Sequence, residues 1–471
     1  MILHLGRSDA IKRSTTTRID QLTEQSTGST NPVERPPQSP PSSMSSLRTS
    51  SSSPVLPLVV LSLLLLSGDA SSKPIVTPIT KDDSTGLYTI PVKNGAPLVL
   101  DLAGPLIWSP CQSPHRTVPC NSSVCKVANR NRPARCGGAS AGSSGDPNCA
   151  CAAFAYNPAS GQCGSGDLTA VPLSANATDG SNPLSPVTFS AYATCAPDAL
   201  LASLPEGAAG VAGLSRQPLS LPSLVASRLK VAKEFALCLP GGGGQTGAAI
   251  FGGGPFVLRA AAPEPMDLAG DIRQNPVPLL KNPKNNGAYY FGVRGIAFNQ
   301  EQLNLPAGAF DLDRRQGTGG VVFSTTTRFT TLRSDIYSAL INAFDAVTRN
   351  VPRRKPAPPL QLCYEASGFP MTFVGPAVPS IDLMLDGGRN WTLPGGNSIV
   401  QTDSATVCFA FDSMGPEQAA AFNSPAVIFG AYQMEDSLIL FDLEKGTFGT
   451  SGLLPARRTN CGNFNFAMGS S

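Results

Sequence analysis

Twelve cysteines are the residues in this chain whose type and spacing suggest chemistry most directly. Thiols in even number can form disulfides, and closely spaced thiols such as Cys149 and Cys151 can also bind zinc. A structural zinc site would use C-x2-C pairs or histidine partners, and neither is present. We therefore expect six disulfides, no metal site and no cofactor. The cysteines are Cys111, Cys120, Cys125, Cys136, Cys149, Cys151, Cys163, Cys195, Cys238, Cys363, Cys408 and Cys461.

Imidazole chemistry and nucleic-acid binding have little support. The only histidines are His4 and His115, so a histidine-rich metal cluster is nearly excluded and His115 is the only plausible imidazole base. Lys plus Arg number 35 and Asp plus Glu number 32, which gives a net charge of +3. This balance leaves no basic surplus for binding nucleic acid through its phosphates. Because charged residues make up only 14%, the 471-residue chain has enough apolar material to build a large core.

A 12-residue apolar run at 55–66 indicates an export signal. It is too short to span a bilayer, which takes about 20 residues, and small residues follow at Gly68 and Ala70. Residues 44–70 are therefore predicted to be a signal peptide. Residues 1–43 are predicted to be a disordered leader or the product of a mispredicted start, with a signal anchor and cytoplasmic tail as the alternative. With the cysteines, this signal predicts a secreted, extracellular protein with no membrane segment in its mature form.

Three sequons and one basic stretch mark expected surface positions. Asn121, Asn176 and Asn390 each begin an N-x-[ST] sequence and are candidate glycosylation sites. Residues 353–359 are proline-rich and basic, so they are expected to form an exposed loop. Its Arg353-Arg354-Lys355 sequence is a candidate site for proteolytic nicking.

The mature chain has an all-β pattern with few helices. Residues 87–92 alternate as a strand does, Asn94-Gly95 is a hairpin turn signal, and residues 97–101 are typical of a buried strand. The helices predicted from apolar periodicity are at 221–230 and 335–348. Short strands separated by turns therefore dominate the expected fold.

A weak twofold repeat relates the two halves of the chain. One apolar strand ends at Asp101 and another ends at Ser324. An apolar-apolar-glycine segment follows each strand, ending at Gly213-Leu214 in the first half and at Gly430 in the second. The separation is 109 residues from Asp101 to Gly210 and 106 residues from Ser324 to Gly430. A duplicated β lobe explains this spacing.

This arrangement resembles the pepsin-like aspartic proteases. Residues 207–222 are similar to the plant branch of that family, and residues 427–449 are similar to its C-terminal strands. The resemblance covers residues 73 to 461. It implies an all-β, bilobal pepsin-like fold with a few short helices, an N-terminal lobe at 73–280 and a C-terminal lobe at 285–461.

The catalytic chemistry of the proteases is not conserved here. It requires two carboxylates about 3 Å apart that share one proton, each supplied by an Asp-[Thr/Ser]-Gly loop. The chain contains no such tripeptide, since the corresponding loops read Asp101-Leu102-Ala103 and Ser324-Thr325-Thr326. Asp101 and Ser324 are therefore predicted to be vestigial positions without aspartic endopeptidase activity. A Ser324–His115 pair has no G-x-S-x-G context. By resemblance, Tyr156 matches the flap tyrosine.

Within the fold family, the plant TAXI-type xylanase inhibitors are the most similar subgroup, with basic 7S globulins and secreted dermal glycoproteins as relatives. Loss of the catalytic pair is normal in this subgroup. The resemblance implies six disulfides, among them Cys363–Cys408 and Cys238–Cys461. It is carried by residues 99–111, 194–214, 235–240, 250–255 and 390–448.

The resemblance also implies where a partner enzyme would bind. Inhibitors of this type place a histidine near the C-terminus against the catalytic carboxylates of a family 11 xylanase. Here Arg457 and Arg458 follow Leu454-Pro455, and a guanidinium could address carboxylates in the same way, unless both arginines are merely solvated. A second contact loop corresponds to Thr327, Arg328 and Phe329, where Phe329 either enters a sugar subsite or belongs to the core.

The resemblance therefore implies a catalytically inactive homologue, secreted to the apoplast or cell wall, that inhibits microbial cell-wall glycoside hydrolases of the endo-xylanase type in plant defence. Its partner would be a microbial xylanase or a related hydrolase, bound by a monomer. Two alternatives stay open. One is a residual aspartic endopeptidase that depends on Asp101. The other is a storage or peptide-binding protein like the 7S globulins.

Overall fold

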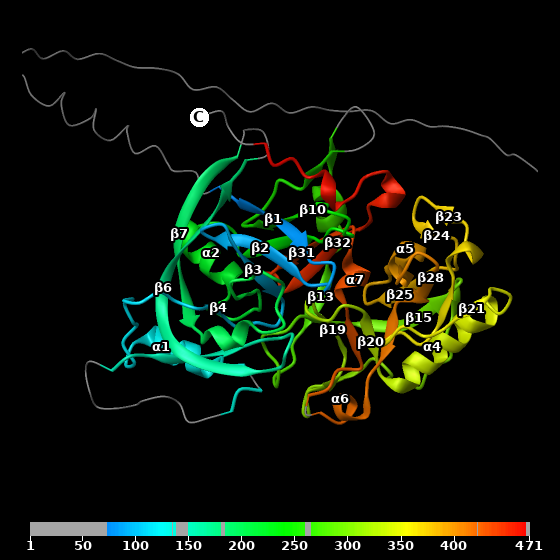
Figure 1. Cartoon of the computed structure of the whole chain (residues 1–471), viewed down its shortest axis with the longest axis horizontal. Coiled ribbons are helices and arrows are strands. Elements are labelled where there is room, and N and C mark those ends of the chain that lie inside the picture. The colour runs from blue at the N-terminus through cyan, green and yellow to red at the C-terminus, as the bar shows by residue number, and fades with distance from the viewer. Residues whose placement is uncertain are drawn as a thin grey trace, which may run out of the picture. The chain divides into compact units, whose positions relative to one another are not determined.

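The structure is a computed structural model, and most of the chain beyond residue 72 is described in it (Figure 1). The predicted leader and signal peptide lie outside the described residues. The chain is mostly β-structure in two lobes, which Figure 1 shows in blue to green and in yellow to orange. The described residues are 73–133, 135–137, 149–179, 184–259, 265–421 and 423–467.

The elements of the described residues are short. The α-helices are α1 (Ser123–Arg130), α2 (Leu221–Leu229), α3 (Ala269–Arg273), α4 (Ser334–Val347), α5 (Gly395–Ser398), α6 (Pro416–Ala420) and α7 (Ala431–Met434). Strands up to residue 267 are β1 (Ile75–Lys81), β2 (Tyr88–Lys93), β3 (Ala96–Asp101), β4 (Ile107–Ser109), β5 (Ala152–Tyr156), β6 (Cys163–Ala177), β7 (Ser185–Cys195), β8 (Val211–Gly213), β9 (Glu234–Cys238), β10 (Thr246–Phe251), β11 (Val257–Leu258) and β12 (Met266–Asp267).

The strands after residue 267 are shorter on average. They are β13 (Val277–Leu280), β14 (Tyr290–Phe291), β15 (Val293–Phe298), β16 (Glu301–Gln302), β17 (Leu312–Asp313), β18 (Thr318–Gly319), β19 (Val321–Phe323), β20 (Thr330–Leu332), β21 (Arg353–Arg354), β22 (Cys363–Glu365), β23 (Met371–Thr372), β24 (Gly375–Pro376), β25 (Ile381–Leu385), β26 (Asn390–Leu393), β27 (Ile399–Gln401), β28 (Thr406–Phe409), β29 (Phe411–Ser413), β30 (Val427–Phe429), β31 (Ser437–Asp442) and β32 (Thr447–Leu453).

The predicted hairpin and helices are present. β2 and β3 pair antiparallel, and both turn residues, Asn94 and Gly95, have positive φ. That geometry favours an Asn-Gly pair. The helix predicted at 221–230 is α2, and the one predicted at 335–348 is α4, whose buried face includes Ile336, Leu340 and Phe344 at helical spacing.

One predicted loop is partly a strand. Residues 353–359 were expected to form an exposed loop, and both arginines at its start are exposed. However, Arg353 and Arg354 form β21, which pairs antiparallel with Tyr364 and Cys363 of β22. Arg353 also packs its guanidinium 4.3 Å from the Tyr364 ring centroid, a cation–π contact that holds the strand in place.

The two lobes share a continuous sheet. β10 pairs with β9, β9 pairs with β31 from the other half of the chain, and β31 continues through β32 to β13. At the crossing, Phe235 of β9 lies opposite Phe441 of β31, with their ring centroids 4.9 Å apart. Because these fully buried rings come from both lobes, the apolar core extends across the lobe boundary.

A buried ion pair also joins the lobes. The Lys81 ammonium at the end of β1 lies 2.7 Å from a carboxylate oxygen of Glu435, just after α7. Tyr88 of β2 donates its hydroxyl to the same oxygen at 2.5 Å. The Lys81 and Glu435 side chains are 8% and 6% exposed. Burial raises the pKa of the Glu435 carboxyl, and the neighbouring Lys81 partly opposes this shift.

All twelve cysteines are paired, which confirms the expected six disulfides, and no cysteine is free. Both pairs that the family resemblance implied are present. Four disulfides lie within the first half of the chain, one lies within the second half, and Cys238–Cys461 closes a separation of 223 residues. The pairs are Cys111–Cys195, Cys120–Cys149, Cys125–Cys151, Cys136–Cys163, Cys238–Cys461 and Cys363–Cys408.

Among the residues that the structure describes, no helix is both long and apolar enough to cross a membrane.

Candidate functional site

Two equivalent strand ends form the centre of the molecule. β3 ends at Asp101 and pairs in parallel with β8, so that Asp101 lies opposite Gly213. β19 ends one residue before Ser324 and pairs in parallel with β30 in the same way, with Phe323 opposite Phe429. The parallel pairing in both halves confirms the predicted repeat, but the register makes Gly213, and not Gly210, the counterpart of Gly430. It is the arrangement that places one catalytic carboxylate per lobe in an active aspartic protease.

The two loops contact each other through one threonine. The hydroxyl of Thr325, from the second loop, donates to the Leu100 carbonyl at 2.7 Å and accepts from the Leu102 amide at 3.2 Å. The first loop has Leu102 at the equivalent position, and this side chain is fully buried and has no polar atom. Only the second loop therefore supplies a side-chain hydroxyl that hydrogen-bonds to the backbone of the other loop.

Asp101 is a buried carboxyl, and no other carboxyl of the described residues forms a hydrogen bond with it. Its side chain is 5% exposed, and one oxygen accepts from the Ala103 amide at 2.9 Å. Burial raises the pKa of Asp101 to about 6, and hydrogen bonds from the Ala103 and Gly104 amides partly oppose the shift. The chain around Gly104 is tightly packed, since an added Cβ would lie 2.8 Å from the Gly213 Cα.

Ser324 has its hydroxyl occupied by its own turn. The oxygen accepts from the Thr327 amide at 3.0 Å and from the Thr326 amide at 3.3 Å, and the hydroxyl donates to the Thr327 hydroxyl at 3.0 Å. A serine in this setting can neither hold a negative charge near neutral pH nor polarise a carbonyl as a protonated carboxyl does. The arrangement therefore lacks the two proton-sharing carboxylates that activate water in aspartic proteolysis.

The only plausible imidazole base is engaged elsewhere. His115 Nδ1 lies 3.3 Å from the Gln112 carbonyl, and Nε2 lies 3.5 Å from a carboxylate oxygen of Asp167. These contacts place His115 in the cysteine-rich part of the first lobe and give no support to a pair with Ser324. Among the described residues there is also no cluster of three or more His, Cys, Asp or Glu side chains that could hold a metal ion.

Hydrogen bonds hold the tip of the β5–β6 hairpin, which contains Tyr156, the residue that the resemblance matches to the flap tyrosine. Tyr156 ends β5, and its carbonyl accepts from the Trp108 indole at 2.8 Å. The next residue, Asn157, is fully buried and donates its amide to the Leu200 and Ala202 carbonyls, both at 2.8 Å. In a protease this hairpin must move as substrate enters and leaves. Here Asn157 joins the hairpin to a neighbouring segment of the same lobe.

The first predicted contact loop is only partly at the surface. Thr327 is half-buried, and its carbonyl accepts from the Ala431 amide at 2.9 Å. Arg328 is exposed, and its guanidinium lies 5.0 Å from the Phe329 ring centroid. Phe329 is only 8% exposed and packs edge-on against Tyr432, with ring centroids 5.6 Å apart. The structure therefore supports the core alternative for Phe329 and not its entry into a sugar subsite.

The two C-terminal arginines have different surroundings. Arg457 donates to a carboxylate oxygen of Asp271 at 2.5 Å, so its charge is paired. Arg458 is exposed and has a left-handed backbone with φ of 56°. Its guanidinium lies 5.6 Å from the ring centroid of Phe373, which is 82% exposed. Of the two predicted contact residues, Arg458 is the one whose charge faces solvent.

Sequence reasoning missed Phe373 and its neighbour Met371, which is 75% exposed. Both lie in the small β23–β24 hairpin, in which Gly375, the first residue of β24, has φ of 94°. Apolar residues between Pro370 and Gly375 are the signal that could have indicated a hairpin with an apolar tip. Arg458, Phe373 and Met371 are called the C-terminal surface below.

The candidate glycosylation sites are accessible to different degrees. Asn121 and Asn390 are exposed, and Asn390 begins β26. Asn176 is half-buried within β6, where it lies opposite Val76 of β1 and Pro186 of β7. A glycan on Asn121 or Asn390 would extend into solvent, whereas Asn176 is flanked by strands on both sides.

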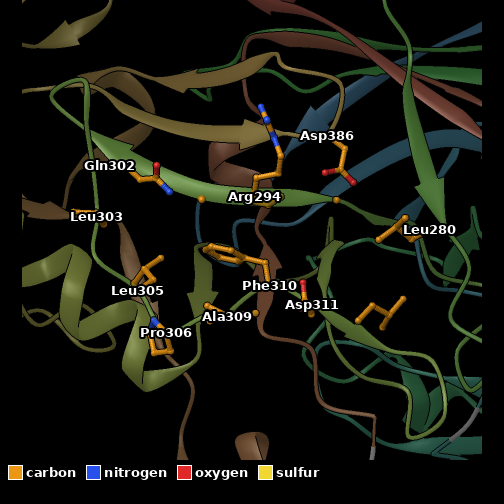
Figure 2. A pocket seen from close by; sticks show the side chains of 16 residues that line it. Leu280, Arg294, Gln302, Leu303, Leu305, Pro306, Ala309, Phe310, Asp311 and Asp386 are labelled. Carbon is orange, nitrogen blue, oxygen red and sulfur yellow. The ribbon is translucent and has the colours of Figure 1, made fainter.

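A cavity of about 480 Å³ lies in the second lobe, apart from these loops (Figure 2). Leu305 and Phe310 give it apolar walls, and Asp311 and Asp386 also line it. Arg294 extends from β15 on the side opposite to Phe310 in Figure 2, and its Nε donates to the Leu385 carbonyl at 3.2 Å. None of the residues lining the cavity belongs to the loops that carry Asp101 and Ser324.

The burial of Asp101 predicts how its replacement affects stability. Because the pKa of the folded carboxyl is raised to about 6, its contribution to stability is full below about pH 4 and is lost as the pH rises through 6. Asn has the same shape but no charge. We expect Asp101→Asn to match the parent at pH 4 and to be more stable by roughly 2 kcal/mol at pH 8, measured by urea unfolding.

The matched control is Asp335→Asn. Hydrogen bonding to Arg333 lowers the pKa of Asp335, so this variant should be less stable than the parent by a nearly constant amount above about pH 4, and the difference should shrink as the pH falls through the folded-state pKa. Parallel pH profiles for Asp101→Asn and the parent would show that Asp101 does not ionise over this range.

The fold and the paired loops define a pepsin-like protein, and comparisons with known proteins agree on that class. The sequence matches the family "Xylanase inhibitor N-terminal" over residues 88–253 and "Xylanase inhibitor C-terminal" over residues 288–451. The chain belongs to this xylanase-inhibitor family of pepsin-like proteins.

Individual relatives in the family carry different names. Chitinase CLP of Oryza sativa subsp. japonica is 46% identical over 405 residues, which cover 84% of this chain and 92% of the relative. The crystal structure of edgp has a TM-score of 0.73 at 29% identity and covers 84% of this chain and 98% of that chain. Basic 7S globulin from soybean has a TM-score of 0.66 at 28% identity, covering 84% and 99%.

Proposed function

We propose that this protein is a secreted, catalytically inactive pepsin homologue that inhibits microbial cell-wall glycoside hydrolases of the endo-xylanase type, as a monomer acting in plant defence. The observation that carries the proposal is the incomplete catalytic pair in a member of the xylanase-inhibitor family. Asp101 is a buried carboxyl in the first loop, and the second loop has the Ser324 hydroxyl at the equivalent position, so the two loops do not supply a pair of carboxylates that could share a proton. A protein of this family without that chemistry acts by binding.

The C-terminal surface supplies the contact that the proposal needs. The catalytic cleft of a glycoside hydrolase contains two carboxylates and binds pyranose rings. An exposed guanidinium can bind a carboxylate through two parallel hydrogen bonds, and an exposed aromatic ring can take the place of a sugar. Arg458 and Phe373 present these two groups side by side. Arg457 is less suited to this role because Asp271 already neutralises it.

Inhibition of a family 11 xylanase by the mature chain tests the proposal. We expect stoichiometric inhibition, and we expect Arg458→Ala to raise the inhibition constant by at least about tenfold, because a charge-assisted hydrogen bond to a carboxylate is lost. Arg457→Ala is the matched control, since it removes the same charge one residue away and should change the constant by less than about threefold. Both variants should unfold at the same denaturant concentration as the parent.

Two results would count against the proposal. If a panel of xylanases and glucanases is unaffected at micromolar protein, the chain is not an inhibitor of this class. If Arg458→Ala inhibits as well as the parent, the contact lies elsewhere and the assignment of the C-terminal surface is wrong. Phe373→Ala in the same assay separates the ring from the guanidinium.

A storage or peptide-binding function is the second candidate, and the similarity to soybean basic 7S globulin favours it. Accumulation in seeds together with binding of a peptide and no inhibition of hydrolases would support this candidate. Acid-pH cleavage of casein that Asp101→Ala abolishes would instead support a residual endopeptidase. Because one relative is named a chitinase, chitin hydrolysis belongs in the same panel, and we expect none from this chain.

The remaining assignments are part of the same proposal. The lobes are assigned to residues 73–280 and 285–461, and the secreted form begins after a signal peptide at 44–70. Glycans are proposed on Asn121 and Asn390, the sequons that are exposed. Mass spectrometry of protein purified from its source would test the processed N-terminus and both glycans in one experiment.

A further inference from the structure

Basic charge is concentrated in one segment of the chain. Residues 102–166 contain five Lys and Arg residues but only one acidic residue, Asp146, whereas the whole chain has a net charge of only +3. Four of these cations, Lys126, Arg130, Arg132 and Arg135, are exposed and lie within ten residues of one another. The mechanism proposed above uses none of them.

Helix α1 places two of the cations side by side. Lys126 and Arg130 are four residues apart, so they are neighbours on one helix face, while Cys125 and Ala128 are buried. Neither cation forms an ion pair among the described residues, and the same is true of Arg135. Their charges are therefore not neutralised by this part of the protein.

The chain after α1 places the other two cations beside aromatic side chains. The Arg132 guanidinium lies 5.8 Å from the Phe154 ring centroid, and Arg135 donates to the Tyr156 hydroxyl at 3.3 Å. Phe154 and Tyr156 are two residues apart in β5, so they share one face of the strand, and both are half-buried. The buried Ala153 and Ala155 lie on the other face. Lys126, Arg130, Arg132, Arg135, Phe154 and Tyr156 are called the basic face.

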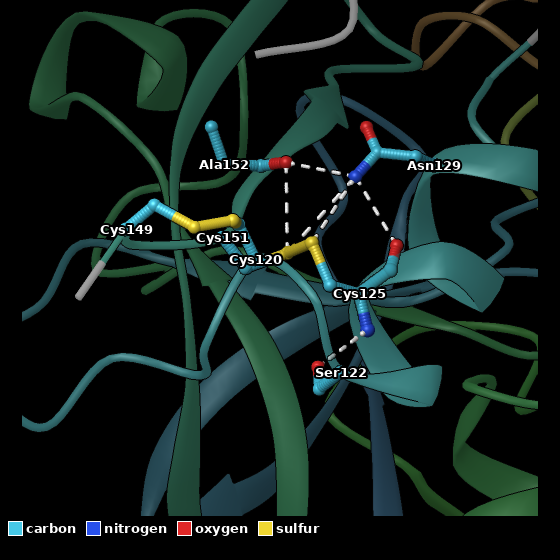
Figure 3. The surroundings of a disulfide bond; sticks show 7 residues. All are labelled: Cys120, Ser122, Cys125, Asn129, Cys149, Cys151 and Ala152. Atoms are coloured by element: carbon cyan, nitrogen blue, oxygen red, sulfur yellow. Dashed lines mark hydrogen bonds between the residues drawn. A yellow bond between two sulfur atoms is a disulfide. The ribbon is translucent and has the colours of Figure 1, made fainter. Parts of the chain in front are cut away.

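The support beneath the basic face is rigid (Figure 3). Cys125 of α1 is bonded to Cys151, which immediately precedes β5. Asn129 donates its side-chain amide to the Cys125 and Ala152 carbonyls, both at 3.1 Å, which fastens the helix to the strand a second time. On either side, Cys120–Cys149 and Cys136–Cys163 hold the flanking segments. This cross-linked support fixes the backbone that carries the cations, so that binding need not order the backbone as well.

We propose that the basic face binds an acidic polysaccharide, a polymer of pyranose rings that carries carboxylates at regular intervals. Guanidinium and ammonium groups bind carboxylates through charge-assisted hydrogen bonds, and half-buried aromatic rings offer flat apolar surface to the C–H faces of sugars. The six disulfides indicate an oxidising compartment. Outside the cell, carboxylated polysaccharides rather than nucleic acids are the abundant polyanions. This binding is independent of the inhibitory surface, which lies in the other lobe.

Binding of the mature chain to polygalacturonate at low ionic strength tests the proposal. We expect binding that weakens as salt is added, because bound cations release counterions from the polymer. Lys126→Gln/Arg130→Gln should bind about tenfold more weakly. The matched control is Arg314→Gln/Arg315→Gln, which removes the same net charge from an exposed basic pair in the second lobe and should bind within about twofold of the parent.

The rings are tested with a polyanion that has no sugar. Phe154→Leu retains an apolar side chain but removes the flat ring, so it should weaken binding to polygalacturonate by a few-fold and leave binding to polyphosphate unchanged. A circular dichroism spectrum identical to that of the parent excludes misfolding of this variant.

Three outcomes would overturn the proposal. The first is absence of binding to polygalacturonate at low salt. The second is an equal loss in both double variants, which would mean that only net charge matters. The third is equal or tighter binding to polyphosphate or to anionic lipid vesicles, which would show that the face recognises charge without recognising sugar. Normal xylanase inhibition by Lys126→Gln/Arg130→Gln would show that the two surfaces are separate.

Discussion

Replacement of Lys81 by methionine is expected to lower the free energy of unfolding by about 3–5 kcal/mol, because it leaves a buried carboxylate without its cation. Lys81 and Glu435 are 354 residues apart in the sequence and both are nearly inaccessible to solvent. Their contact joins β1 to the segment after α7, so its loss should also weaken the association of the lobes. Guanidinium chloride unfolding at pH 7 measures the effect.

The dependence on pH separates this cause from a general loss of packing. The pKa of Glu435 is already raised by burial, and removal of Lys81 should raise it further. A carboxyl with a raised folded-state pKa keeps its full stability contribution below its unfolded pKa and loses it as the pH rises. The Lys81→Met variant should therefore be impaired less at pH 4 than at pH 8.

Two further variants complete this test. Lys81→Met/Glu435→Gln removes both charges and should recover a large part of the loss, as expected for two coupled residues. Lys445→Met breaks the surface pair with Asp442, in which the lysine is 70% exposed, and should change stability only slightly. A pH-independent defect in Lys81→Met, or no recovery in the double variant, would contradict a role for the buried charge.

Removal of the Cys238–Cys461 disulfide should have an effect of similar size. The bond joins β9 of the first lobe to the segment that follows Arg458, across 223 residues. In the chain-entropy description, closing a loop of that length stabilises the folded state by about 5 kcal/mol, against about 4 kcal/mol for a 45-residue loop. We expect Cys238→Ala/Cys461→Ala to destabilise by about 3–5 kcal/mol in urea unfolding under oxidising conditions.

The Cys363–Cys408 bond is the matched control because it closes 45 residues within one lobe. Cys363→Ala/Cys408→Ala should be the less destabilised of the two variants. Loss of the long-range bond should also impair inhibition more than stability alone explains, because Arg458 lies three residues before Cys461. An equal loss in the two variants would argue against the loop-length explanation.

The duplicated strands, the paired loops and the paired cysteines could be predicted from the sequence. β3 is a short apolar run that ends in Asp101, and β19 is one that Ser324 follows directly. Each has a later apolar-apolar-glycine partner at a similar separation. Such signals lie within short stretches of the sequence, so they can be recognised from the sequence alone. The Cys238–Cys461 pair came from family resemblance, because twelve cysteines allow too many connectivities for spacing to decide.

Contacts between residues far apart in the sequence could not be predicted, because no nearby motif indicates which residues will meet. From the sequence, Arg457 was predicted to contact a partner protein, but in the structure its guanidinium pairs with Asp271, 186 residues away. Phe329 follows a surface loop in the sequence, but Tyr432 of α7 covers it. Phe373 was missed because an exposed aromatic tip violates the general preference for burying large apolar side chains.

The Cys238–Cys461 bond would hold the two parts of a cleaved chain together. Arg353 and Arg354 are exposed, and a protease that cut after them would separate the molecule into two polypeptides. Four of the six disulfides lie before that cut and one lies after it, so only Cys238–Cys461 spans it. A nicked molecule would therefore run as one species on a gel without reductant and as two species with it. Maturation into a two-chain form would need no new bond, only a cut.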